Sequence, residues 1–431
     1  MAHIAVIGAG ITGVTTAWSL LGRGHDVTLF DKNRYAAMET SFANGGQLSA
    51  SNAEVWNRWA NVLKGIKWMM RADAPLKFSL RPSCHTYSWM AEFLANIPNH
   101  ERNTVATTRM AIAAREHLFA MARDAGIDFD LERRGILHVY ADRTGFEHAA
   151  NVNRLLARGG LMREAVSPAD IRALEPALKG EFFGGFYTQG DSTGDIHKFS
   201  VGLADAAVKR GAIFVNEAAI TRLSRDQGGV AVAFDHRGSA HDARFDAVVI
   251  CAGTASRALA AQLGDRVNIY PVKGYSITVD LADAASREAA PWMSLLDDDA
   301  KIVTSRLGAD RFRVAGTAEF AGFNRDIRAE RIAPLVKWCE RHFPAMRTEH
   351  VTPWAGLRPM MPNMMPKVGA GRAPGVYYNT GHGHLGWTLS AATADMIAAR
   401  INADHAGRTT DWDRWRWPPN EVTGRQSFTG K

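Results

Sequence analysis

The sequence predicts a mixed α/β fold with two domains, and three observations support this prediction. A strand, a glycine-rich turn and a helix follow one another at the start of the chain. An alternating apolar pattern at 270–316 indicates a second, β-rich unit without nucleotide signatures. The chain has 431 residues, which is too long for one simple core.

The first element is a nucleotide-binding turn. The apolar run 4–7 leads into Gly8, Gly10 and Gly13, after which the apolar residues take helical spacing. Gly8 allows the tight turn, Gly10 lets the backbone approach a pyrophosphate, and Gly13 lets the helix lie close to the strand. Free N–H groups at the helix N-terminus favour phosphate. The alternative interpretation is a turn without a ligand.

A second strand, 27–30, ends on Asp31, at roughly the ~20-residue distance from the glycines expected of a ribose-binding carboxylate. An acid at this position, in place of an arginine, argues against a ligand with a 2′-phosphate. The sequence therefore favours FAD or NAD over NADP.

Composition excludes several classes of protein. The fractions of apolar and charged residues are those of an ordinary soluble protein, and no apolar run or signal-peptide layout is present. We therefore expect a cytoplasmic protein. Three cysteines without a CxxC pair argue against iron–sulfur and zinc sites, so no metal is expected. The net charge of +7 is scattered and accompanies no nucleic-acid motif, which favours anionic lipid or a carboxylate substrate over nucleic acid.

The segment 40–47 is small, polar and rich in glycine, so it suits either a cradle for phosphates and a ribityl chain or a surface loop. The segment 56–93 is rich in tryptophan and methionine. We favour a role for it in the core or over a substrate cavity. The alternative is an amphipathic contact with the inner face of a membrane.

The middle of the chain returns to the first sheet. Helices are predicted at 104–125, 146–158, from 168, and at 198–210, and strands at 135–140, 182–187, 213–216 and from Ile220. The continuous apolar strand 245–251 is typical of burial on both faces, so Ala252 and Gly253 are candidate dinucleotide neighbours at its carboxyl end. The strands 270–279, 302–304 and 312–316 indicate the sheet of a substrate domain.

The C-terminal third carries two further motifs. Arg358 lies in an apolar, proline-bounded segment, 354–359. The segment 376–386 runs from a strand through a glycine loop into a helix over 387–401, and this second glycine-rich helix start indicates another electron-rich ligand group.

Together these blocks resemble the D-amino-acid oxidase superfamily of FAD-dependent oxidoreductases. The blocks are the N-terminal fingerprint, Lys273-Gly274-Tyr275-Ser276, Gly356-Leu357-Arg358-Pro359 and 379–387. The resemblance covers residues 1–402 and is greatest to bacterial D-amino acid dehydrogenases of the small-subunit type. It implies a glutathione-reductase-type Rossmann FAD-binding domain (1–50, 150–225, 240–265 and 345–431). This domain is interleaved with an antiparallel-sheet substrate domain (51–149, 226–239 and 266–344).

The resemblance also implies the site residues. FAD is expected to bind non-covalently, and its candidate contacts are Gly8, Gly10, Ile11, Thr12, Gly13, Asp31, Lys32, Ser41, Asn44, Gly45, Gly46, Gln47, Ile220, Ala252, Gly253, Gly381, His382, Gly383, His384, Leu385 and Gly386. The catalytic candidates are Arg358, Tyr275 and His382: the arginine clamps the substrate carboxylate, and the tyrosine belongs to the pocket roof. The alternatives are an Arg358 paired with a buried acid and a His382–His384 metal pair.

The implied reaction is oxidative deamination of a D-amino acid, in which a hydride passes from the α-carbon to the flavin and the imine hydrolyses to a 2-oxo acid. The expected electron acceptor is a quinone or another carrier. Alternatives are a secondary amine such as D-hydroxyproline or an N-substituted glycine, a 2-hydroxy acid, and a flavin subunit of a larger dehydrogenase. The segment 361–366 departs from the family pattern Thr-Pro-Asp-Gly-x-Pro by losing an acid and gaining methionines, which leaves the substrate side chain open.

Overall fold

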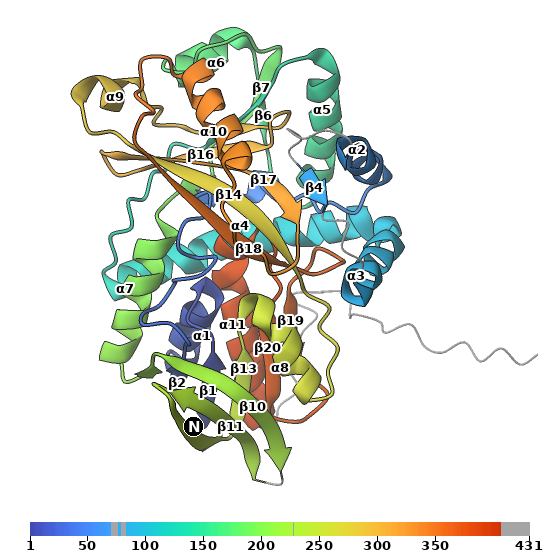
Figure 1. Ribbon diagram of the computed structural model, residues 1–431, viewed down its shortest axis with the longest axis vertical. Coiled ribbons are helices and arrows are strands. Elements are labelled where there is room, and N and C mark those ends of the chain that lie inside the picture. The colour runs from blue at the N-terminus through green and yellow to red at the C-terminus, as the bar shows by residue number, and fades with distance from the viewer. Residues whose placement is uncertain (70–75, 79–82, 227, 407–431) are drawn as a thin grey trace, which may run out of the picture.

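The computed structural model describes residues 1–69, 76–78, 83–226 and 228–406. Met70 of the tryptophan-rich segment and the end of the predicted domain 345–431 lie outside the described residues. Figure 1 shows two large sheets, with the six-stranded sheet in the lower half of the molecule and the nine-stranded sheet in the upper half.

The six-stranded sheet is the predicted nucleotide-binding sheet, in the order β19-β20-β13-β1-β2-β9. Its strands are β1 (His3–Ile7), β2 (Asp26–Phe30), β9 (Ile213–Val215), β13 (Ala247–Ile250), β19 (Lys367–Ala370) and β20 (Val376–Thr380). All pairs are parallel except β19 with β20. The predicted strand 245–251 is interrupted at Asp246, whose carboxylate accepts a hydrogen bond from the His3 N–H at 2.7 Å.

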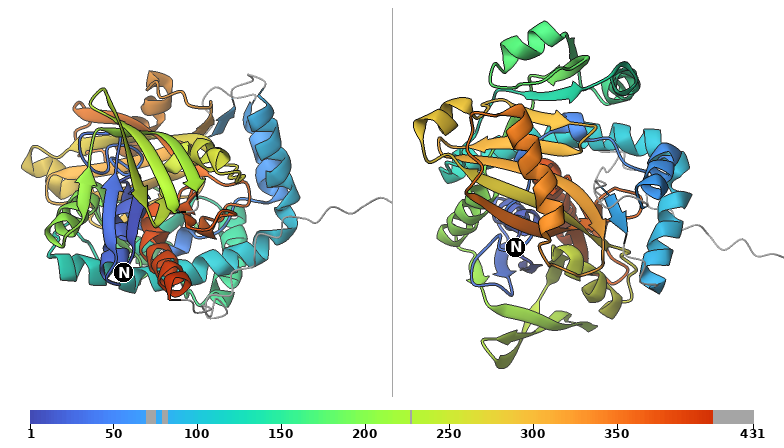
Figure 2. Two further views of the ribbon diagram at one scale, coloured as in Figure 1. Left: turned by 90° about the horizontal axis from the view of Figure 1, so that it is seen from below. Right: turned by 45° about the horizontal axis from the view of Figure 1, so that its top comes forward.

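Both faces of this sheet are covered, which explains its nearly continuous apolar strands. Ile4 and Val6 pack with α1 (Ile11–Leu21), α4 (His100–Ala125), α7 (Ile196–Lys209) and α11 (Gly386–His405). Ala5 and Ile7 pack with α8 (Ser256–Gln262) and a three-stranded sheet of β10 (Ala218–Asp226), β11 (Gly229–His236) and β12 (Ser239–Phe245). Figure 2, left, shows the green three-stranded sheet and the red α11 on different sides of the blue strands.

The nine-stranded sheet has the order β18-β14-β17-β16-β15-β5-β7-β6, with β4 added on β17. Its strands are β4 (Leu76–Phe78), β5 (Ile136–Tyr140), β6 (Glu164–Val166), β7 (Gly184–Thr188), β14 (Tyr270–Asp280), β15 (Ser294–Asp297), β16 (Ile302–Leu307), β17 (Arg311–Phe320) and β18 (Val351–Met360). One face packs on α10 (Ala329–His342) through Ile277, Val314 and Leu335.

The remaining elements surround this framework. They are α2 (Trp59–Met69), α3 (Cys84–Ala95), α5 (Arg143–Arg158), α6 (Pro168–Leu174), α9 (Ala284–Ala289), the pair β3 (Gln47–Leu48) and β8 (Ser192–Thr193), and 3-10 turns at Ala50–Asn52, Ile97–Asn99 and Gly253–Ala255. Among the helices described, none combines the length and apolar character needed to cross a bilayer.

The sheets divide the chain differently from the predicted domain boundaries. Strands β6 and β7 fall within 150–225 and β18 falls within 345–431, yet all three belong to the nine-stranded sheet. Strand β11, within 226–239, pairs with β10 and β12 beside the nucleotide-binding sheet. The predicted boundaries place these strands in the other domain because pairing between residues far apart in the sequence decides which sheet a strand joins. The predicted return of 213–216 to the first sheet and the antiparallel sheet at 270–316 are both observed.

Candidate active site

One cavity of ≈ 960 Å³ is lined by residues from both large sheets and from the loops at their ends. The predicted cofactor residues that line it are Gly8, Gly10, Ile11, Thr12, Asp31, Lys32, Ser41, Asn44, Gly45, Gly46, Gln47, Ile220, Ala252, Gly253, Gly381, His382, Gly383, His384, Leu385 and Gly386. Arg358 and Tyr275 line the same cavity. Gly13 is not among the lining residues and has a packing role instead.

The glycine turn needs its glycines for geometric reasons. Gly8 has φ +102°, and a Cβ there would lie 2.7 Å from the carbonyl oxygen of Cys251. A Cβ on Gly13 would overlap the Gly8 carbonyl group, so only glycine lets α1 lie this close to β1. The N–H of Ile11, in the first turn of α1, donates to Ser41 Oγ at 3.0 Å.

Asp31 holds the turn in place. Its carboxylate accepts from the N–H of Ala9 at 2.7 Å and from the N–H of Asn33 at 2.8 Å. Burial raises the pKa of Asp31, and these hydrogen bonds oppose that rise by stabilising the anion. Lys32, which also lines the cavity, forms an ion pair with Glu39 at 2.9 Å.

The segment 41–47 borders the cavity instead of lying on the surface as an ordinary loop. Asn44 Oδ1 accepts from the Gly46 N–H at 2.9 Å and so closes a local turn. A Cβ on Gly46 would lie 2.9 Å from Ser305, so glycine allows the segment to approach β16. Gln47 donates to Ser294 Oγ at 2.8 Å, and its side chain therefore attaches the segment to β15.

The loop between β20 and α11 contains two glycines with left-handed backbones, Gly381 (φ +76°) and Gly383 (φ +59°). His382 is buried and its Nε2 lies 2.9 Å from Thr393 Oγ1. Burial lowers the pKa of His382 to about 3, so the ring is neutral at pH 7. No group of three or more His, Cys, Asp or Glu side chains in the described chain could hold a metal ion.

Arg358 projects from β18 to the cavity face of the strand pair β14–β18. A Cβ on Gly274 of β14 would overlap its guanidinium group, so this glycine makes room for the arginine. Arg358 Nη1 donates to the Thr317 carbonyl oxygen at 3.2 Å. Across the described residues no carboxylate forms an ion pair with Arg358, and desolvation lowers its pKa to about 10. The interpretation of Arg358 as the partner of a buried acid therefore has no support.

Tyr275 borders the cavity, but its hydroxyl group is used elsewhere. Because side chains alternate along β14, Tyr275 shares a face with Lys273, opposite to the face of Gly274. Its hydroxyl donates to Glu319 at 2.7 Å, and its ring belongs to the core beneath α10. Tyr275 therefore lines the cavity while its hydroxyl group is held by Glu319, and a direct role in binding the substrate stays a prediction.

Several cavity residues had no sequence motif to reveal them. Trp56 stacks on His384 with ring centroids 4.7 Å apart. Burial lowers the pKa of His384 to about 4, and the positive charge of Arg358 contributes to this shift in the same direction. Only the abundance of tryptophan in 56–93 pointed to this region. Thr317 was missed because a carbonyl contact has no residue signature.

The tryptophan-rich segment has two environments. Trp89 is buried and donates from its indole to the Met360 carbonyl at 2.9 Å, so part of the segment covers the cavity as favoured. Asn57 donates to the carbonyl oxygen of Pro362, in the loop 361–366, at 2.9 Å. Trp59, in contrast, is 61% exposed. The contact with Asn57 therefore fastens the altered loop 361–366 to the tryptophan-rich segment. Met364 in this loop is buried and has a left-handed backbone (φ +61°).

Comparison with known proteins gives consistent results. A "D-amino acid dehydrogenase 3" of Mesorhizobium japonicum is 62% identical over 94% of this chain and 98% of its own length. A "D-amino acid dehydrogenase" of Paramagnetospirillum magneticum is 41% identical over 93% and 96% of the two chains. Among solved structures, glycine oxidase from Geobacillus kaustophilus superimposes with a TM-score of 0.72 at 19% identity, covering 96% of this chain and 98% of that one, which shows the shared fold.

The family comparison covers nearly the whole chain. The family model described as "FAD dependent oxidoreductase" matches residues 3–400, which include the glycine turn, both large sheets and Arg358. The chain therefore belongs to the DAO family of FAD-dependent oxidoreductases.

Proposed function

We propose that this enzyme oxidises D-amino acids and that Arg358 binds the substrate carboxylate. The observation that carries the proposal is a cation on the cavity wall without a carboxylate partner among the described residues. A guanidinium fork matches a carboxylate with two parallel hydrogen bonds. The names of the relatives support an amino acid over a 2-hydroxy acid or a secondary amine.

The residues present fit FAD. Gly10 and Gly253 line the cavity, and a Cβ on Gly253 would meet no atom within 4 Å, so glycine keeps this space open for a ligand. The first turn of α1 would hold the pyrophosphate, and Asp31 and Ile220 would border the adenosine. FAD supplies the chemistry of hydride acceptance when it is bound.

The chain's own residues then supply position and electrostatics. Arg358 orients the substrate so that its α-carbon faces the flavin, and neutral His382, held by Thr393, keeps the glycine loop in shape. The N-terminus of α11 at Gly386 places a positive dipole beside the cavity, where it would stabilise negative charge on the pyrimidine edge. We assign no general base, so the substrate amine must be neutral and activity should rise with pH.

The test is anaerobic bleaching of flavin absorbance by a panel of D-amino acids, L-amino acids, N-alkyl glycines, D-hydroxyproline and 2-hydroxy acids. We expect bleaching by D-amino acids. Bleaching by another class alone would replace the proposed substrate, and a purified chain that no member bleaches would support a flavin subunit that needs a partner.

We also propose that helices α2 and α3 contact an anionic membrane surface and that electrons leave to a quinone or another carrier. Figure 1 and the right view of Figure 2 show both helices on one side of the molecule. Their exposed apolar side chains include Trp59 (61%), Leu63 (64%) and Tyr87 (62%), beside exposed Lys64. Met90 of α3 also lines the cavity, so this surface adjoins the site.

Co-sedimentation with anionic phospholipid vesicles tests the membrane contact. The double variant Trp59→Ser/Leu63→Ser should stay in the supernatant, whereas Ile213→Ser, at an exposed position of β9, should pellet like the unaltered protein. Vesicle binding retained by the double variant would contradict the proposal.

The electron acceptor is tested by measuring turnover with oxygen and with a soluble quinone or dye under otherwise equal conditions.

A further inference from the structure

Strand β17 is irregular directly opposite Gly274. Lys273 of β14 pairs with Glu319 and Tyr275 pairs with Gly316, so Thr317 and Ala318 together face the single residue Gly274. This arrangement is a β-bulge, and Thr317 has a left-handed backbone with φ +57°. A β-branched residue rarely adopts this conformation, so its surroundings must hold it there.

The bulge has a direct consequence for Arg358. The carbonyl group of Thr317 turns toward the guanidinium and accepts from Nη1 at 3.2 Å. A guanidinium has five N–H donors in a rigid plane, so fixing one of them sets the direction of the others. The carbonyl of Thr317 therefore orients the group that we assign to the substrate carboxylate.

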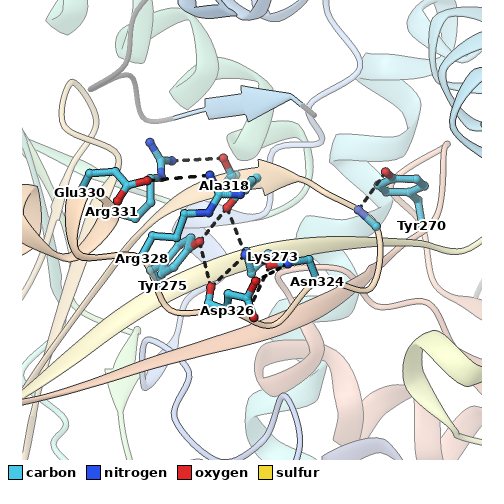
Figure 3. A network of polar contacts seen from close by, with 11 residues as sticks. Tyr270, Lys273, Tyr275, Ala318, Asn324, Asp326, Arg328, Glu330 and Arg331 are labelled. Atoms are coloured by element: carbon cyan, nitrogen blue, oxygen red, sulfur yellow. Dashed lines mark hydrogen bonds and ion pairs between the residues drawn. The ribbon is translucent and has the colours of Figure 1, made fainter. Parts of the chain in front are cut away.

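The Glu319 network lies behind the bulge and consists of buried Lys273, Tyr275 and Glu319 with the partly exposed Arg328. Lys273, Tyr275 and Arg328 are labelled in Figure 3. The Glu319 carboxylate is 1% exposed and accepts from the Tyr275 hydroxyl at 2.7 Å. Its ion pairs reach Lys273 Nζ at 3.3 Å and Arg328 Nη2 at 2.6 Å.

The same network also holds the loop that follows β17. Lys273 Nζ donates to Asn324 Oδ1 at 2.7 Å and to the Asp326 carbonyl at 3.1 Å. Figure 3 shows these residues gathered beside β14 and the end of β17. Lys273 and Tyr275 flank Gly274 on β14, and their backbone partners Glu319 and Gly316 lie on either side of the bulge. The network residues therefore bracket Thr317 along the strand pair.

We infer that the Glu319 network is a positioning set for Arg358. The network holds the β-bulge in its conformation, and the bulge directs the Thr317 carbonyl toward Arg358. The carbonyl in turn sets the orientation of the guanidinium group that we propose binds the substrate carboxylate. The inference rests on the proposed role of Arg358 and gives Tyr275 and Glu319 a function that acts through Arg358. Loosening the network should weaken carboxylate binding while Arg358 itself is still present.

The experiment compares Glu319→Gln and Tyr275→Phe in the FAD-loaded protein. Tyr378→Phe is the matched control, because Tyr378 is also fully buried and donates to a carboxylate, that of Asp265 at 2.9 Å, in the FAD-binding part. Benzoate, a simple carboxylate, is titrated into each protein and followed by the flavin absorbance spectrum. KM and kcat are measured with the amino acid that bleaches the flavin best.

We expect Glu319→Gln to raise the benzoate Kd and the KM about tenfold and Tyr275→Phe to raise them about threefold, each with kcat within twofold and full flavin content. Tyr378→Phe should leave both constants unchanged. If the network served stability alone, its variants would lose flavin content and kcat together instead of raising KM and the benzoate Kd selectively. That result would overturn the inference.

Arg358→Ala separates the two proposals. If it abolishes benzoate binding while the network variants bind normally, the positioning role is wrong and the role of Arg358 stands. If Arg358→Ala binds benzoate as well as the unaltered protein, the carboxylate clamp itself is wrong. Should Glu319→Gln fail to fold, Tyr275→Phe decides alone, since it removes only a hydroxyl group.

Discussion

The two faces of the β14–β18 pair each carry a cation, but the surroundings of the two cations differ. Lys273, on the face toward α10, is fully buried and forms an ion pair with Glu319. Arg358, on the cavity face, has a carbonyl contact and no ion pair in the described structure. A desolvated charge is unfavourable unless a partner compensates it. The chain compensates Lys273 itself, whereas the partner that we propose for Arg358 is the substrate carboxylate.

This difference in partners is the structural basis for the role that we propose for Arg358. The pKa of Glu319 shows the same compensation: burial alone raises it, but the Tyr275 hydrogen bond and the charges of Lys273 and Arg328 hold it below its ordinary value. Among the described residues no comparable opposing group acts on Arg358, whose pKa desolvation lowers to about 10.

The largest expected effect is on catalysis. Arg358→Ala should lower kcat/KM by about 10³-fold, because losing a desolvated charge-assisted contact costs about 4 kcal/mol and each ~1.4 kcal/mol is tenfold. Steady-state kinetics and flavin absorbance should show that FAD stays bound. Loss of flavin together with activity would assign Arg358 to the cofactor instead.

The next effect contrasts the two cations in stability. Lys273→Met should lower the free energy of unfolding by about 3 kcal/mol, because Glu319 stays buried with one cation fewer. Arg358→Met should change it by less than about 1 kcal/mol, since no protein carboxylate loses its partner. Urea unfolding of the FAD-free proteins measures both free energies of unfolding. Equal destabilisation by the two substitutions would contradict the proposed difference between Lys273 and Arg358.

A smaller effect should follow from Gly274→Ala. The added methyl group would overlap the guanidinium of Arg358, which can move because it ends a flexible side chain. We expect normal folding with KM raised about tenfold, or about 1.4 kcal/mol. Gly145→Ala in α5 is the control, since its Cβ would approach no atom closer than 3.6 Å and KM should not change. An unaltered KM in Gly274→Ala would show that the exact place of the guanidinium does not matter.

The smallest expected effect is on the pH dependence of stability. The pKa of His384, beside Arg358, falls from the ordinary 6.5 to about 4 in the folded protein. Between these values the unfolded chain binds a proton that the folded chain does not, so stability falls as the pH decreases from about 6.5 toward 4 and is unaffected above that range. His384 borders the cavity, so we expect a loss of about 1 kcal/mol between pH 6.5 and 5. His384→Asn should reduce the slope of unfolding midpoint against pH, and an unchanged slope would contradict the assignment.

Much of the site was predictable because its signals are local. The turn at Gly8 and Gly13 follows from which backbone angles and contacts glycine allows. The composition of 41–47 left a ligand cradle and a surface loop equally open, and the resemblance to the family favoured the cradle. The face of Tyr275 was harder to predict. Alternation places Tyr275 with Lys273 and apart from Gly274, but the sequence does not say which face meets the cavity. The glycine at 316 inside a strand pattern was the only local sign of the bulge at Thr317.

By itself, the sequence determined that the chain has a glycine-turn nucleotide site, a separate β-rich region and one arginine in an apolar, proline-bounded segment. These properties depend on neighbouring residues in the chain. The resemblance to the family added the antiparallel sheet and the carboxylate-binding role of the arginine. Only the tertiary structure decided that β6, β7 and β18 join one sheet and that Glu319 compensates Lys273. It also decided that Arg358 faces the cavity with no ion pair to any residue that the structure describes. The physical reason is that strand pairing and charge compensation depend on distances in space between residues far apart in the sequence.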